Sequence, residues 1–159
     1  MKSSLEKGFG FGLTSGIITT LGLIVGLHSS THLPIAVIGG IIIIAIADAF
    51  SDAMGMHVSE EFELKHSKKE VWESSIMTFF SKFVFALTFV IPFVLFELST
   101  AIFVSIAWGL SLITGFSFYL AKREKIKPYK VVIEHLAISI LVIIVAHYVG
   151  DLVRSIFGG

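Results

Sequence analysis

The sequence of 159 residues contains no cysteine, only three prolines and few charged residues. Without cysteine the chain has no disulfide scaffold, no thiolate zinc site and no thiol nucleophile. Charged residues make up 15% of the chain, whereas soluble domains contain about 25%. Basic and acidic residues balance to a net charge of zero, so neither a nucleic-acid partner nor a disordered acidic chain is expected.

Apolar residues dominate what is present, at 55% of the chain with a mean hydropathy of +0.90. A helix that crosses a bilayer needs about 20 mostly apolar residues. Five segments meet this need, at roughly 9–28, 34–57, 75–96, 100–121 and 131–155. None of them alternates as a barrel strand would. The sequence therefore predicts an all-α integral membrane protein, a single five-helix transmembrane domain over 1–159 whose first partner is the lipid bilayer.

The prolines indicate where the spans begin or bend, and the basic residues indicate their orientation in the membrane. Pro34 fits the first turn of the second span, and Pro92 is expected to kink the third. All basic residues except Arg154 fall on one side of a five-span arrangement, as does a short acidic connector over 60–73. The positive-inside rule then predicts a cytoplasmic N-terminus and an outside C-terminus. The short connectors and tails favour a prokaryotic inner membrane.

The second span carries a stripe of polar side chains at a spacing of four, formed by Asp48, Asp52, Met56 and Glu60. An ionisable side chain within a span costs about 2.5–3.5 kcal/mol on insertion scales, so it usually faces a cavity, a partner or an ion path. Hard carboxylate oxygens combined with a soft thioether favour a transition metal such as Fe²⁺ or Mn²⁺. The alternative is that the methionine packs against lipid and the aspartates reach the headgroups.

The first span contains two pairs of glycines four residues apart, Gly12 with Gly16 and Gly22 with Gly26. Small residues at this spacing let helix backbones approach closely, and such faces often form dimer seams. A dimer seam along the first span is therefore one interpretation of these glycine pairs, and packing against another helix of the chain is the other.

Two further polar residues enter the fifth span from its cytoplasmic side. Glu134 and His135 lie near the start of this span and form a hypothetical proton relay toward Asp52. The hypothesis depends on histidine, which titrates near neutral pH.

Two segments resemble the vacuolar iron transporter family. Residues 12–20, GLTSGIITT, are similar to its first helix, which typically reads G-x-N-D-G-x-x-S/T-T. Residues 49–59, AFSDAMGMHVS, are similar to its second helix, commonly A-x-S-M-A-x-G-E-Y-V-S. The resemblance extends to Pro92, to the basic linker before the fifth span and to the five-span layout.

The resemblance implies a homodimer whose first two helices line an ion path, and which exports ferrous iron and often manganese from the cytosol in exchange for protons. The family's aspartate in the first helix falls on Ser15, and its methionine in the second helix falls on Asp52. The family's glutamate falls on Met56, so carboxylate and thioether ligands are both kept in exchanged places. The family's long acidic cytoplasmic insert is reduced here to the short connector.

The leading hypothesis is a transporter that moves a divalent transition metal, Fe²⁺ or Mn²⁺, out of the cytosol, with proton antiport as its coupling. The metal is a substrate and not a resident cofactor, and its expected ligands are Asp48, Asp52, Met56, Glu60 and Ser15. The alternative is a non-transporting membrane interaction or assembly protein with the same architecture, in which the aspartates bond across helices. The sequence has no H-E-x-x-H and no G-x-S-x-G motif, so an enzyme is not expected.

Overall fold

The computed structural model describes residues 3–63 and 65–158 of the chain. Within these residues every regular element is an α-helix, and no strand is present. The helices are α1 (Ser3–Thr31), α2 (Pro34–Phe62), α3 (Lys68–Thr88), α4 (Val90–Leu95), α5 (Leu98–Arg123) and α6 (Pro128–Phe157). Taking α3 and α4 as one span, the described chain has five helices long and apolar enough to cross a membrane. The prediction of an all-α chain with five such helices is confirmed.

Prolines set three of the helix boundaries. Pro34 begins α2 and Pro128 begins α6. At the first position of a helix the backbone N–H has no partner within the helix, so its absence in proline costs no hydrogen bond. Pro92 cannot donate to the carbonyl of Thr88, and its ring crowds that carbonyl. The third span is accordingly interrupted at Phe89, which separates α3 from α4. The kink predicted at Pro92 is therefore seen as a break between two helices.

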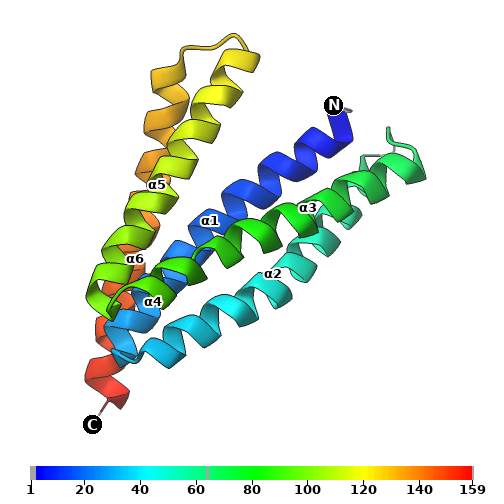
Figure 1. Cartoon of the computed structure of the whole chain (residues 1–159). Coiled ribbons are helices and arrows are strands. Elements are labelled where there is room, and N and C mark those ends of the chain that lie inside the picture. Colours follow the sequence, from blue (N-terminus) through cyan, green and yellow to red (C-terminus); the bar gives the residue numbers. More distant parts are fainter. Residues whose placement is uncertain (1–2, 64, 159) are drawn as a thin grey trace. The chain divides into compact units, whose positions relative to one another are not determined.

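The chain divides into two compact units. The first combines the described chain up to Thr20 with Ile41–Val90, so it contains the start of α1, most of α2 and all of α3. The second combines Leu21–Gly40 with the described chain from Ile91 onward, and it contains the end of α1, the start of α2, and α4 to α6. Figure 1 shows the three helices of the first unit and the α5–α6 hairpin of the second.

In the first unit, α1 packs against α3 along a face of small residues. A Cβ atom built on Gly12 would lie 2.5 Å from the carbonyl oxygen of Thr78, and one built on Gly16 would lie 3.1 Å from Cα of Lys82. Gly8 faces the carbonyl of Ser74 even more closely. The glycines therefore allow the two backbones to touch, and the Gly12–Gly16 face is occupied within one chain.

Hydroxyl and aromatic side chains complete this unit. Ser81 donates a hydrogen bond of 3.0 Å to the carbonyl of Phe9, which ties α3 to α1. Between α2 and α3, the rings of Phe50 and Phe79 lie 4.6 Å apart, and those of His57 and Trp72 are in edge contact at 4.6 Å. The three helices thus pack through close backbones on one side of α3 and through aromatic rings on the other.

In the second unit, the second glycine pair serves the same purpose against α6. A Cβ atom on Gly22 would lie 2.9 Å from the side chain of Val142, and one on Gly150 would lie 2.5 Å from the carbonyl of Gly26. Both glycine pairs of the first span therefore contact helices of the same chain. The spacing that suggested a dimer seam thus serves helix packing within one chain, and the homodimer stays a prediction.

Candidate ion site in the first unit

The two aspartates of α2 meet a lysine from α3. Nζ of Lys82 lies 2.5 Å from Oδ2 of Asp48 and 2.5 Å from Oδ2 of Asp52. The two carboxylates are one helical turn apart on α2, and the lysine reaches them from the neighbouring helix. Asp48 and Asp52 are thus brought together, as the sequence predicts, around a cation that belongs to the protein.

Ser15 of α1 joins this cluster. Its hydroxyl donates a hydrogen bond of 2.6 Å to Oδ2 of Asp52 and accepts one of 2.9 Å from Nζ of Lys82. The close α1–α3 contact at Gly16 places Ser15 beside the lysine stem. Each of the three helices of the first unit therefore contributes to one polar cluster, defined here as the Lys82 cluster: Ser15, Asp48, Asp52 and Lys82.

The members of the Lys82 cluster differ in burial. The side chain of Lys82 is 2% exposed, whereas those of Asp48 and Asp52 are 27% and 20% exposed. With all three groups ionised, the cluster carries one net negative charge. The lysine offsets part of the cost of holding carboxylates in an apolar span, because the opposite charges attract, and Ser15 adds a hydrogen bond to Asp52.

Glu60 lies two turns further along α2, about 12 Å from Asp52 along the helix axis. Its side chain is fully buried and forms an ion pair with Lys7 of α1. Nε2 of His66 lies 3.5 Å from Oε2 of Glu60 and 3.2 Å from Oε2 of Glu63. Met56 lies between Asp52 and Glu60 in sequence and is buried in the first unit. The acidic stripe of α2 is therefore matched by two separate lysines.

The connector carboxylate Glu63 belongs to this second ion pair. Lys7 donates a hydrogen bond of 3.1 Å to Oε1 of Glu63. This bond, followed by the contact with His66, holds the pKa of Glu63 below its ordinary value. The N-terminal turns of α1 are thus joined to the α2–α3 connector through Lys7.

The hypothetical proton relay lies in the second unit. Glu134 and His135 are both on α6, as expected from the sequence. Nδ1 of His135 lies 2.8 Å from the hydroxyl of Ser117 on α5, so the imidazole takes part in α5–α6 packing. A role in proton transfer stays a prediction.

The donor set of the Lys82 cluster consists of two carboxylates and one hydroxyl. Within the described part of the chain, no three histidine, aspartate or glutamate side chains come together as a metal site. A divalent cation at Asp48 and Asp52 would have to take the place that the ammonium of Lys82 holds, because the two positive charges repel. Chemically, the cluster is suited to exchange one cation for another or for a proton.

Sequence reasoning missed both lysines as partners of the acids. A signal for Lys82 was present, since it is a lone basic residue inside an apolar span and the neighbouring span carries lone acids. Charges within a membrane usually pair with one another, so lone charges of opposite sign on adjacent spans indicate a pair. Lys7 gave no such signal, because it lies among the polar residues that precede the first apolar run.

The chain was compared with known proteins. No protein-family model matches it, and no curated protein matches its sequence.

Proposed function

We propose that this chain is a membrane transporter of divalent cations such as Fe²⁺ or Mn²⁺, and that the Lys82 cluster is its ion site. The observation that carries the proposal is the pair of partly exposed carboxylates, Asp48 and Asp52, held by the buried ammonium of Lys82. Two acids and a base at this place in a span are costly to insert, and such groups mark ion and proton pathways more often than they serve packing alone.

Lys82 acts in this proposal as a tethered cation that fills the site when no metal is bound. The cluster keeps one net negative charge, so it attracts cations even in that state. A long lysine stem allows the ammonium to withdraw, and a lysine loses its proton readily when a second positive charge approaches. Entry of a divalent cation therefore expels the ammonium or its proton, and return of the proton expels the metal. This exchange is the proposed basis of proton antiport.

The proposal includes a homodimer that contacts through α2. Carboxylates that are 27% and 20% exposed on a spanning helix need water or protein in front of them, because lipid cannot solvate them. The same helix also exposes Ala47 and Ser51, which lie beside the two carboxylates on α2. A second copy facing α2 would cover these residues and enclose a path beside the carboxylates. Light scattering of the purified protein in detergent measures this stoichiometry.

The transport proposal is tested by Mn²⁺ flux into proteoliposomes. We expect Asp48→Ala and Asp52→Ala to abolish most of the flux because each removes a metal ligand. Lys82→Arg is the sharper variant, since arginine keeps the positive charge but cannot be deprotonated in a protein. We expect it to fold and to lose flux. Lys69→Arg, at a 75% exposed side chain of α3, is the matched control. Normal flux in Lys82→Arg and in both alanine variants would refute the site.

A second candidate function is a non-transporting membrane interaction or assembly protein. The observation that favours it is that Lys82 already pairs with both aspartates across helices within one subunit. On this hypothesis the cluster only holds α2 to α3, and no metal binds. Calorimetry with Mn²⁺ separates the two hypotheses: the transporter binds metal and loses binding in Asp52→Asn, whereas the assembly protein shows no binding heat in either form.

A further inference from the structure

A groove runs between α2 and α3 on the outside of the first unit. Its volume is about 530 Å³, and its walls are almost entirely apolar. The large apolar residues that line it are Phe50 and Met54 from α2 and Trp72, Ile76, Phe79 and Phe80 from α3. Residues 50 to 61 of α2 span about 16 Å along the helix axis, which is the scale of an acyl chain. The groove is therefore shaped for an elongated apolar group.

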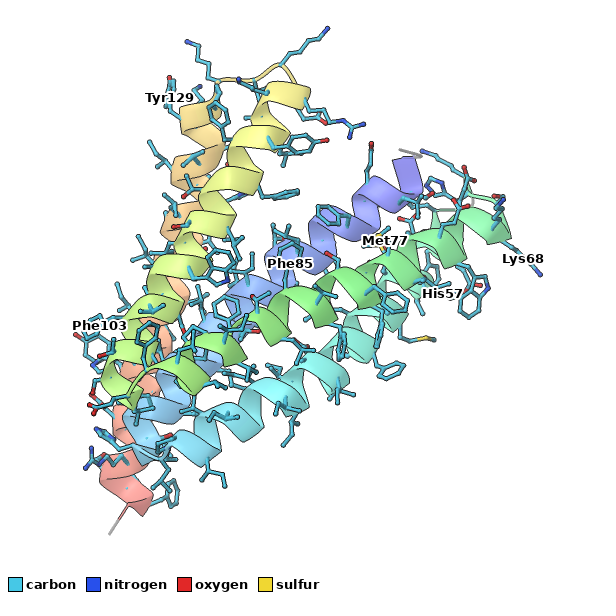
Figure 2. All side chains as sticks on the ribbon, in the orientation of Figure 1. His57, Lys68, Met77, Phe85, Phe103 and Tyr129 are labelled. Atoms are coloured by element: carbon cyan, nitrogen blue, oxygen red, sulfur yellow. The ribbon has the colours of Figure 1, made fainter. Side chains whose placement is uncertain are left out.

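A polar hollow of about 410 Å³ continues the groove toward the α2–α3 connector. It shares His57 and Trp72 with the groove, and its other walls include Glu61, His66 and Lys68. Figure 2 shows His57 on α2 and Lys68 at the start of α3, near the connector end of both helices. Trp72, with an apolar ring and one N–H donor, stands at the boundary, a place that tryptophan favours at membrane surfaces.

The charges around this hollow leave a positive group available. Its acidic residue Glu61 lies 3.6 Å from His57, and the nearby Glu63 is held by Lys7 and His66. Lys68 is exposed and forms no ion pair with any described residue, and the same is true of Lys65 in the connector. An anionic group entering the hollow would therefore find one lining lysine, Lys68, that is not already neutralised by an ion pair.

From this combination we infer that the groove and the hollow together bind one anionic phospholipid. An acyl chain lies along Phe50, Ile76 and Phe80, and the phosphate lies at the connector end beside Lys68. Basic pockets at the ends of membrane helices recognise anionic headgroups in this way. The apolar groove without the lysine would accept any lipid, and the lysine without the groove would attract any anion. Their continuity selects a lipid with a negative headgroup, whether or not the chain transports metal.

The inference is tested with the full-length protein in detergent by native mass spectrometry. The protein is mixed with equal amounts of phosphatidylglycerol and phosphatidylcholine that carry the same acyl chains. We expect phosphatidylglycerol to be retained about fivefold more, the preference that one lysine confers near an anionic surface. Lys68→Gln should reduce this preference toward equality, whereas Trp72→Ala should lower retention of both lipids. Lys127→Gln, in the connector between α5 and α6, is the matched control and should keep the preference.

Any of three results in this competition would overturn the inference. The first is equal retention of the two lipids by the unaltered protein. The second is an unchanged preference in Lys68→Gln. The third is an equal loss of preference in Lys127→Gln, which would assign the effect to general charge. An excess of inorganic phosphate distinguishes the source of the anion: a free-phosphate site would release the lipid, and the proposed site would not. Thermal unfolding of each variant, measured alongside, shows that it is folded.

Discussion

Ser15 of α1 donates a hydrogen bond of 2.6 Å to the carboxylate of Asp52 on α2. In the resemblance to vacuolar iron transporters, that family's first-helix aspartate falls on Ser15 and its second-helix methionine falls on Asp52. Because the two side chains touch, moving the acid from one helix to the other leaves it beside the same ammonium. Nζ of Lys82 is within 2.9 Å of both positions.

Exchanging these two residues should therefore preserve the cluster. We expect Asp52→Ser to lower the stability of the detergent-solubilised protein by about 1.5–3 kcal/mol, the value of hydrogen bonds to a charged group. The double variant Ser15→Asp with Asp52→Ser should regain more than half of this loss, as measured by reversible unfolding in mixed micelles. Ser15→Asp alone should be destabilising, because it brings a third carboxylate to the cluster. An exchange variant no more stable than Asp52→Ser would show that the two positions are not equivalent.

Alanine substitution at two glycines should change the stability in opposite directions, because one glycine lies in the α1–α3 contact and the other faces open space. Gly12→Ala should destabilise the protein by about 1–3 kcal/mol, because the added Cβ would lie 2.5 Å from a carbonyl oxygen of α3, and backbone cannot move aside cheaply. Gly55→Ala is the matched substitution on α2, where no atom lies within 4 Å of the added Cβ. It should stabilise by up to about 1 kcal/mol through helix propensity. Thermal unfolding of both variants measures the difference, and equal changes would contradict the packing.

We expect the stability of the protein to depend on Lys7, because Lys7 neutralises the buried carboxylate of Glu60. The side chain of Glu60 is fully buried, so Lys7→Met removes its lysine partner and leaves a buried negative charge beside His66. We expect a loss of about 3 kcal/mol, at the low end for breaking a buried pair because Lys7 is 43% exposed. Adding Glu60→Met should recover most of the stability in the same unfolding assay. A double variant as unstable as Lys7→Met would refute the pairing.

The connector carboxylate gives a pH-dependent prediction. The pKa of Glu63 lies below its ordinary value of 4.5, chiefly because Lys7 donates a hydrogen bond to it and secondly because of His66. Its contribution to stability is therefore complete above pH 4.5 and is lost as the pH falls through the lower pKa of the folded protein. An NMR titration of the Glu63 carboxyl carbon measures this pKa. Lys7→Gln should return it toward 4.5, and His66→Asn should move it less.

Much of the fold could be predicted from the sequence because burial in a membrane imposes a simple length rule. Each apolar run is helical, with a break at Phe89 in the third, and several helices continue into adjacent polar residues; α2, for example, extends through Glu60 to Phe62. Pro34 and Pro92 also acted as expected, since a missing N–H has the same local effect in any helix.

The composition of the site could be predicted only in part. The spacing of Asp48 and Asp52 shows that they share a face of α2, but not which residue of another helix that face meets. That partner depends on the rotation of α3, which the α1 glycines fix through contacts more than sixty residues apart in sequence. The partner of Glu60 could not be predicted for the same reason. Glu60 was expected among the metal ligands, and the structure shows it in an ion pair with Lys7 from the start of α1.

The glycine face of α1 also has a mechanical consequence. At Gly8, Gly12 and Gly16 the backbones of α1 and α3 meet with no side chain between them. A slide of one helix along the other would press backbone atoms together, because no flexible side chain lies between them that could give way. We therefore expect α3 to move together with the part of α1 that it contacts, and in the proposed transport cycle the movement that opens Asp48 and Asp52 is assigned to α2.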